Sequence, residues 1–330
     1  MGGILGPDGK PVKAESIKTP ERALGMSGIE FDYVSEGLTP GALAQLMKDA
    51  DQGDVGAQAQ LYDQMIQKDG HLQAEYGKRR RALLSVEWTL EAGDSSAEAK
   101  KAQELVQMNL DSLRMRSLYE ALQYRIGHGF AAVELMWQII DGQSVIAGMK
   151  YQRQRRFKFE EKTDSPLVYV DGKDDPVKVD PFRLILAKYG GLSGDPKIGE
   201  VFRACAWYYL FKNYTLKDWL VFAEVYGMPL RIGTFSPGAD DDQKNALRVA
   251  LRMLGSDGAG IIPEGSKIEF ISHKGTGGAD IYERLAKYCE AGMSKVLVGQ
   301  TLSAEVGKTG SYAAAKTHRE VALDLTEGDA

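Results

Sequence analysis

The sequence predicts an α+β fold, in which helices and small sheets occupy separate stretches of the chain. Apolar residues recur at helical spacing over most of 39–126, and short β-branched or aromatic segments separated by turn residues fill 130–188. The stretch 199–297 then alternates helices with short strands. The chain has 330 residues, which at about 150 residues per domain corresponds to roughly two domains or one elaborate domain.

The composition is that of an ordinary globular chain and excludes several classes of protein. Hydrophobic residues make up 43% and charged residues 26%, which excludes a mostly disordered chain. The 41 basic and 46 acidic residues give a net charge of −5, which argues against a protein that coats nucleic acid. The two cysteines form no disulfide framework, which favours a reducing intracellular environment. No apolar run is long enough to span a membrane, and the first residues do not resemble a secretory signal.

The first part of the chain is predicted to be helical after a glycine-rich extended arm at 1–38. We expect a helix from Thr39-Pro40, a second over about 56–68, a third from near Leu72, a fourth from a Ser95-Ser96-Ala97-Glu98 capping box to about Leu113, and a fifth over about 116–126. Apolar residues alternate with polar residues over 84–90, which predicts a half-buried strand between the third and fourth helices.

A β-hairpin is the clearest strand signal. Residues 130–140 read FAAVELMWQII, and Asp141-Gly142 is typical of a tight turn before a second strand over 144–152. The segments RRFKFE, PLVYVDG and FRLILAKY are short, apolar on alternate positions and bounded by turn residues, so a meander is expected to follow.

The second half of the chain alternates the two kinds of element. We expect helices over 199–212 and 215–226 (the second capped by Thr215), a strand over 228–235, a helix over about 241–254, two short strands around Pro263-Glu264-Gly265, and a helix over 279–297. The last helix places Ile281, Leu285 and Tyr288 at helical spacing.

One segment resembles a phosphate-binding loop. Gly307-Lys308-Thr309 matches the end of the G-x-x-x-x-G-K-[ST] pattern, but Leu302 occupies the place of its first glycine and a helix precedes it where a strand is required. We therefore interpret it as a flexible loop with one positive charge. A nucleotide hydrolase that uses Lys308 is kept as an alternative function.

Other charged clusters have simple structural interpretations. The basic and aromatic run at 150–159 is interpreted as a sheet face whose aromatic residues lie in the core, and Lys78–Arg81 as a surface or interface cluster. The four histidines lack metal-ligand spacing, so no metal site and no cofactor are expected. The acidic run Asp240-Asp241-Asp242 is expected to be solvated or to cap the following helix. No pattern supports catalysis.

Several long segments of the second half together resemble one family. They are LFKNYTLKDWLVFAEVYGMPLRIGTF at 210–235, ALRMLGSDGAGIIPEGSKIEFI from 250, and YERLAKYCEAGMSKVLVGQTLSAEVGKTGSYAAAKTHREV from 282. In order and spacing they resemble the portal proteins of Mu-like tailed bacteriophages and prophages. The resemblance covers most of 40–322 and includes RRFKFE and DPFRLILAKYGG, with little contribution from the first 38 residues.

The resemblance implies the α+β portal fold, with an α/β wing, a helical stem pair, a small α/β clip and a tunnel loop. The implied domains are an N-terminal arm (1–38), the wing (39–198), a first stem helix region (199–227), the clip (228–273), a second stem helix (274–299), the tunnel loop (300–317), and the start of a crown or a truncated C-terminus (318–330). Family members normally continue into a helical crown, whereas this sequence stops at Ala330, so only a helix after about Ala313 is expected there.

The same resemblance implies roles for particular residues. The DNA-channel and tunnel-loop residues are Gly307, Lys308, Gly310, Lys316 and His318; the stem residues are Ile281, Leu285, Lys287, Tyr288 and Lys295; and the clip residues that dock partners are Met228, Pro229, Arg231, Asp240, Asp241 and Asp242. None of these roles is catalytic.

The implied function is that of a structural ring, usually of twelve subunits, at one vertex of the capsid. Double-stranded DNA passes through it independently of sequence, and its partners are itself, the terminase large subunit, the head–tail adaptor and the major capsid protein, with no membrane. The implied location is the virion, and the host cytoplasm during assembly. A head–tail adaptor is the remaining alternative, although adaptors are commonly much smaller.

Overall fold

The computed structural model describes residues 33–85, 88–140, 142–160, 165–169, 175–189, 195–198, 200–227, 231–253, 259–264, 278–300 and 324–329. Helices dominate, and the strands form small sheets, so the predicted α+β class is confirmed. The chain divides into two compact units, the first formed from 1–210 with 290–330 and the second from 211–289.

The helices of the described chain are α1 (Pro40–Asp51), α2 (Gly56–Lys68), α3 (Gly70–Ala82), α4 (Ala97–Ser112), α5 (Met115–Leu122), α6 (Tyr124–His128), α7 (Val201–Gly227), α8 (Asp241–Met253) and α9 (Gly278–Val298), with 3₁₀ turns at Leu83–Ser85 and Gln154–Arg156 and a short helix at 324–329. The strands are β1 (Phe130–Ile140), β2 (Gln143–Gln152), β3 (Phe157–Phe159), β4 (Pro166–Val168), β5 (Val177–Lys178), β6 (Leu184–Lys188), β7 (Arg231–Phe235) and β8 (Ala259–Pro263).

The first helices begin at residues that satisfy their free backbone N–H groups. Thr39 Oγ1 accepts a hydrogen bond from the Ala42 N–H (3.1 Å), and Pro40 occupies the first helical position, where no N–H is needed. Asp69 similarly caps α3 through bonds from the N–H groups of His71 and Leu72, both 3.0 Å. These starts confirm the predicted helices from Thr39 and near Leu72.

Two details of the segment before α4 differ from the prediction. The N-cap is Ser96, whose Oγ accepts a bond from the Ala99 N–H (3.1 Å), so the helix starts one residue later than a Ser95 cap would place it. The strand expected over 84–90 is wrong in the described part: a 3₁₀ turn ends α3, and 88–92 pair with no strand. Instead, the side chain of Gln103 donates to the Leu90 carbonyl (2.8 Å), which satisfies that acceptor without a sheet.

The predicted hairpin is the centre of the main sheet. β1 pairs antiparallel with β2 on one side and with β6 on the other. Gly142 in the turn has φ +76°, a conformation that favours glycine. β3, β4 and β5 form a second antiparallel sheet. The predicted meander is wrong for β6, because β6 pairs with β1 of the main sheet instead of continuing the second sheet. Phe157 and Phe159 of the basic run are buried, which confirms that its aromatic residues belong to the core.

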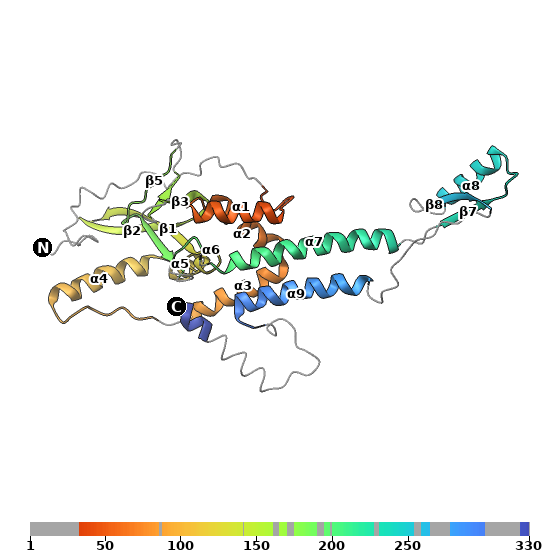
Figure 1. Cartoon of the computed structure of the whole chain (residues 1–330). Coiled ribbons are helices and arrows are strands. Elements are labelled where there is room, and N and C mark those ends of the chain that lie inside the picture. Colours follow the sequence, from red (N-terminus) through yellow and green to blue (C-terminus); the bar gives the residue numbers. More distant parts are fainter. Residues whose placement is uncertain are drawn as a thin grey trace, which may run out of the picture. The chain divides into compact units, whose positions relative to one another are not determined.

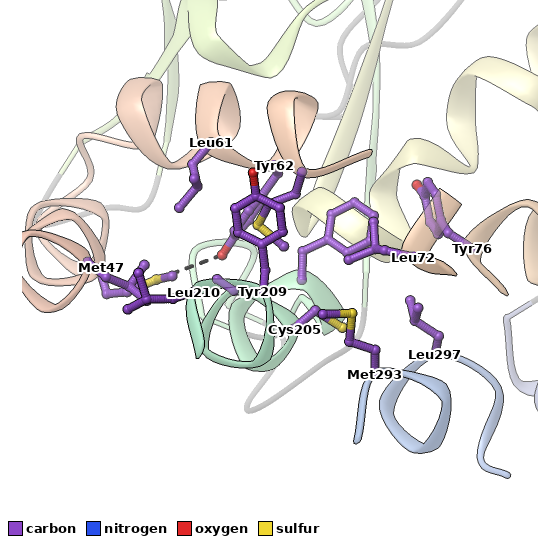
Figure 2. Packing of buried hydrophobic residues seen from close by; sticks show 14 of the residues in the cluster. Met47, Leu61, Tyr62, Leu72, Tyr76, Cys205, Tyr209, Leu210, Met293 and Leu297 are labelled. Carbon is purple, nitrogen blue, oxygen red and sulfur yellow. Dashed lines mark hydrogen bonds between the residues drawn. The ribbon is translucent and has the colours of Figure 1, made fainter. Parts of the chain in front are cut away.

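The main core of the first unit joins helices that are far apart in the sequence. Figure 2 shows side chains of α1, α2 and α3 packed against the start of α7 and the end of α9. The fully buried members include Tyr62 and Leu72 from the early helices, Phe202 and Cys205 from α7, and Met293 from α9. The ring of Phe202 packs edge-on against Tyr62, with ring centroids 5.6 Å apart.

α7 is one continuous helix rather than the two helices expected over 199–212 and 215–226. Thr215 does not cap a second helix. It is buried, and its hydroxyl donates to the Phe211 carbonyl one turn earlier (2.8 Å), a bond that lets threonine remain inside a helix.

The second unit contains a small parallel β–α–β element. β7 and β8 pair in parallel, and α8 connects them as a crossover. Gly233 of β7 lies so close to α8 that an added Cβ would come within 3.0 Å of Leu247 Cγ and 2.9 Å of Leu251 Cδ1. The predicted strand ending at Phe235 and helix over 241–254 are confirmed. The strand expected after the Pro-Glu-Gly turn lies outside the described residues.

A buried carboxyl lies just before α7. Tyr62 and the side-chain amide of Gln58 both donate hydrogen bonds to Glu200 Oε1, the hydroxyl at 2.8 Å. Glu200 Oε2 has no hydrogen-bond partner among the described residues. Burial raises the pKa of this carboxyl from its usual 4.5 to about 8, although the backbone N–H of Glu200 itself, the Tyr62 hydroxyl and the charge of Arg203 oppose the shift. Near neutral pH Glu200 is therefore mainly protonated, and the uncharged acid suits the low dielectric of the core.

This environment makes stability depend on pH in a definite direction. Between pH 4.5 and 8 the folded chain retains a proton on Glu200 that the unfolded chain has released, so the free energy of unfolding falls as pH rises across this window. Glu200→Gln keeps an acceptor for Tyr62 and Gln58 but cannot ionise. We expect its stability relative to the native chain to increase from pH 5 to pH 8 by about 2–4 kcal/mol.

The measurement is urea unfolding of both chains at pH 5, 6.5 and 8. Glu224→Gln, which changes an exposed carboxyl of α7, is the matched control and should run parallel to the native chain. Parallel pH profiles for Glu200→Gln and the native chain would show that Glu200 does not titrate in this window.

Candidate functional site

The helix pair α7 and α9 carries the main candidate surface. Figure 1 shows the two helices running alongside each other. In the first unit, Gly292 of α9 packs against the ring of Tyr208 of α7. A Cβ added at Gly292 would lie only 2.5 Å from Tyr208 Cε1. In the second unit, the rings of Phe222 and Tyr282 are 5.6 Å apart. The pairing of 208 with 292 and of 222 with 282 makes the helices antiparallel.

Within the second unit, α9 has two adjacent apolar stripes. Tyr282 faces Phe222 of α7, and Ala286 and Cys289 continue that stripe at helical spacing and are buried. Ile281, Leu285 and Tyr288 form a second stripe one residue, or about 100°, around the helix. These three are 62%, 44% and 65% exposed. The apolar arc of α9 is thus wider than one neighbouring helix covers.

α7 shows the same excess of apolar surface. Among the described residues sixteen large apolar side chains are exposed, and half of them lie on the second-unit parts of α7 and α9. The members on α7 are Phe211, Tyr214, Leu216, Leu220 and Val221. Leu220 is the most exposed at 67%. We call these five residues with Ile281, Leu285 and Tyr288 the exposed stem face.

The sequence predicted the α9 members of the exposed stem face but not its α7 members. Ile281, Leu285 and Tyr288 were expected on one face, and the structure places them there. The α7 members were missed because the predicted break before Thr215 interrupted the helical pattern. The usable signal was the 3.6-residue spacing that continues from Phe202 through Phe222 without a Gly or Pro.

The predicted basic residues of α9 have ordinary helical environments. Lys287 pairs with Glu283 one turn earlier (2.7 Å), and both side chains are exposed, so the pair contributes only a few tenths of a kcal/mol. Lys295 is exposed in the last turn, where a cation interacts favourably with the helix dipole. The structure does not bring these two lysines into one cluster with other predicted site residues.

The predicted clip residues are described only in part. Asp240 Oδ1 accepts a bond from the Gln243 N–H (2.7 Å) and its own N–H donates to Gln243 Oε1 (3.3 Å), a reciprocal cap of α8. Asp241 pairs with Lys244 (3.3 Å), and Asp242 lies in the first turn. The acidic run therefore caps the helix, as one interpretation expected, which leaves partner docking as a proposal.

Most of the remaining predicted site residues lie outside the described residues. Arg231 is the first residue of β7, where its backbone pairs with Ala259. Met228 and Pro229 lie outside the described residues, as do Gly307, Lys308, Gly310, Lys316 and His318. The tunnel loop and the phosphate-loop resemblance thus stay predictions.

Arg79 is a buried residue whose importance the sequence analysis missed. The expected surface cluster Lys78–Arg81 is wrong for this member, which is 7% exposed. Its guanidinium makes a bidentate ion pair with Asp329, at 2.6 Å from Nε to Oδ2 and 2.8 Å from Nη2 to Oδ1. Burial would lower the pKa of Arg79, but the hydrogen bonds and charge of Asp329 outweigh burial and raise it. Arg79 is therefore a cation within the protein.

No metal-binding group of three or more His, Cys, Asp or Glu residues occurs in the part of the chain that the structure describes. His71 Nε2 lies 2.8 Å from Ser294 Oγ, and His128 Nε2 lies 3.2 Å from Asp63 Oδ1. Cys205 is buried, and desolvation raises the pKa of its thiol to about 12, so it is not a nucleophile at neutral pH. Across the described helices, none is both long and apolar enough to cross a bilayer.

Comparison with known proteins assigns the family. The profile of the family described as the portal protein of Mu bacteriophage matches residues 59–330. The Mu-like prophage FluMu protein gp29 of Haemophilus influenzae is 30% identical over 99% of this chain, and the portal protein of Escherichia phage Mu is 28% identical over the full chain. The chain spans 64% and 65% of the length of these two relatives.

A chain in the solved neck of an empty GTA particle aligns with 87% of this chain and 78% of its own length, at 16% identity and a TM-score of 0.48. The family match covers the exposed stem face and the first-unit core except for its residues before 59. The chain therefore belongs to the family of Mu bacteriophage portal proteins.

Proposed function

We propose that this chain forms a closed ring, of twelve subunits by family resemblance, at one vertex of a phage capsid. The single observation that carries the proposal is the exposed stem face, which one chain alone leaves in contact with water. A second copy that covers this face with a different surface makes a heterologous contact, and such contacts form a ring when the rotation between neighbouring copies closes. The ring location is the virion, after assembly in the host cytoplasm.

The size of the exposed face is adequate for assembly. Full burial of a Leu, Ile or Tyr side chain contributes on the order of 1.5–3 kcal/mol, and the face offers eight large side chains. Several of them together offset the entropy that association costs, on the order of 4–15 kcal/mol. A concentration of large exposed apolar side chains on one helix pair is typical of a surface with a binding role.

We further propose that double-stranded DNA passes through the ring during packaging and ejection. The net charge of −5 suits a channel that lets DNA slide, because a strongly basic lining would hold the phosphates. Lys308 and Lys316 of the segment 300–317 supply weak contacts that are independent of base sequence. The proposed partners of the clip are the terminase large subunit and, after packaging, the head–tail adaptor, while the major capsid protein surrounds the ring.

The assembly proposal predicts that charge on the exposed stem face prevents ring formation. Leu220→Glu and Tyr288→Glu each place a carboxylate where the neighbouring chain would bury it without a partner. We expect both variants to remain near the 36.2 kDa of one chain at micromolar concentration, while the native chain forms a large assembly. Mass photometry gives the mass, and circular dichroism checks the helix content.

Glu283→Lys is the matched control because Glu283 is exposed on the side of α9 opposite Ile281, Leu285 and Tyr288. It is expected to assemble like the native chain. If the native chain stays a monomer at modest salt, or if both apolar-to-Glu variants assemble normally, the exposed stem face is not the assembly surface.

The DNA proposal predicts a defect that is separate from assembly. Lys308→Ala together with Lys316→Ala should leave ring and particle yields unchanged and reduce the DNA packaged per particle. Each exposed contact contributes no more than about 1 kcal/mol, so the effect depends on alteration of every subunit at once. Loss of rings with normal packaging in the surviving particles would instead make the segment an assembly element.

We also propose that the chain hydrolyses no nucleotide and that a separate motor supplies the energy of packaging. Leu302 stands where a phosphate loop has its first glycine, so the tight turn that aims backbone N–H groups at phosphates is missing from the pattern. The purified chain should show no ATP turnover above background in a phosphate-release assay. Turnover that disappears in Lys308→Ala would establish the nucleotide hydrolase instead.

A further inference from the structure

Arg79 contacts three separate parts of the first unit with one guanidinium group. Nε and Nη2 bind the two carboxylate oxygens of Asp329, Nη1 donates to the Leu297 carbonyl (2.9 Å), and Nη2 also donates to the Tyr189 hydroxyl (2.9 Å). Four hydrogen bonds thus leave from a side chain that is almost fully buried. Only arginine has planar donors in the number and directions that this arrangement needs.

The two main partners of Arg79 flank the same stretch of sequence. Leu297 lies in the last turn of α9, which ends where Gly299 adopts φ +69°. Asp329 lies in the short helix 324–329. The carbonyls of the last helical turn lack intrahelical partners, so a cation that binds one of them stabilises the helix end. Arg79 therefore binds both the C-terminal end of α9 and the short helix 324–329.

We propose that Arg79 is a tether that holds the end of α9 and the helix 324–329 together. The two ends of the chain segment between them are then fixed relative to each other. A second cation supports the docked helix: Arg125 donates to the Asp329 backbone carbonyl and, at 3.4 Å, to the Lys188 carbonyl. Asp329 is thus held through its side chain and its backbone. The inference concerns the described flanks and does not depend on the proposed contact with DNA.

The burial of the pair explains why the tether is specific. A buried carboxylate that loses its cation bears the full cost of desolvation, so Asp329 is not stable in its docked position without Arg79. A lysine at position 79 retains the charge, but its single ammonium group cannot reach both oxygens, the carbonyl and the hydroxyl in the same geometry. Loss of either partner should therefore release the helix 324–329 without unfolding the core, which α1–α3, α7 and α9 form from other side chains.

The test measures the distance between the two flanks. Spin labels are placed by Lys295→Cys and Asp324→Cys, both exposed positions, while the native Cys205 and Cys289 are buried. Labelled chain is diluted with unlabelled chain so that each assembly holds at most one pair. Double electron–electron resonance should give a narrow distance distribution in the otherwise native chain, and a distribution at least about twice as wide in Arg79→Lys and in Asp329→Asn.

Two matched variants separate the tether from general damage. Tyr189→Phe removes one bond of Arg79 but leaves both flanks attached, and Arg81→Gln removes an exposed cation of the same helix turn. Both should keep the narrow distribution. The double variant Arg79→Lys with Asp329→Asn should be no wider than either single variant, because the two residues act as one unit.

A second measurement covers the case in which a variant is poorly folded. Trypsin cleaves after Lys308, Lys316 and Arg319, which all lie between the two flanks. In unlabelled chain, Asp329→Asn should raise the cleavage rate there by at least about threefold, with unchanged circular dichroism. A narrow distribution together with an unchanged cleavage rate in Asp329→Asn would overturn the tether and leave Arg79 as a part of the core.

Discussion

The arrangement depends on one packing constraint, the joint burial of the start of α7 and the end of α9 among the first three helices. Phe202 is the centre of this contact, since the rings of Tyr62, Tyr76 and His128 surround it with centroids 4.6–5.6 Å away. Gly127 permits the approach, because a Cβ there would lie 2.3 Å from the Phe202 ring. Truncation of such a buried ring costs about 3–5 kcal/mol, a large share of the stability of a domain.

This constraint explains why the exposed stem face exists. The core buries apolar residues of α7 only as far as Leu210 and of α9 only from Met293 onward. In the second unit the two helices have each other as partner, and one contact stripe on each is enough for an antiparallel pair. The additional stripes, such as Leu216 with Leu220 and Ile281 with Leu285, gain nothing from the pairing. A sequence that keeps them apolar is typical of a surface that a further protein covers.

Local signals predicted most of the fold, and long-range contacts account for the errors. The β1–β2 hairpin and the start of α8 follow from turn and capping residues only a few positions apart, so the sequence contains all of their physical causes. Thr215 was misread because a threonine that binds back to Phe211 and one that caps a helix look alike in sequence. The strand over 84–90 failed because its pattern had no partner strand, and pairing is not encoded locally.

The same difference between local signals and long-range contacts applies to the candidate site. The stripe of Ile281, Leu285 and Tyr288 follows from spacing within one helix, whereas its exposure depends on how much of α9 another helix covers. Arg79 and Asp329 are 250 positions apart, and four consecutive basic residues in the sequence favour a solvated cluster. Only the tertiary structure shows that one of the four points inward.

Glu200 and Asp329 are two acidic residues of the first unit that are buried in different ways. Glu200 receives neutral donors from Tyr62 and Gln58, and its pKa rises to about 8, so it is buried as an acid. Asp329 is instead buried against the guanidinium of Arg79 as one partner of an ion pair. Neutral burial is tolerant of small displacements, whereas a buried ion pair requires its partners at defined positions. The ionic solution is found where a helix end and a distant segment must meet, and the neutral one where helices already pack through apolar side chains. The Arg79–Asp329 pair therefore fixes the position of the helix 324–329 at the end of α9, which the hydrophobic core alone does not do.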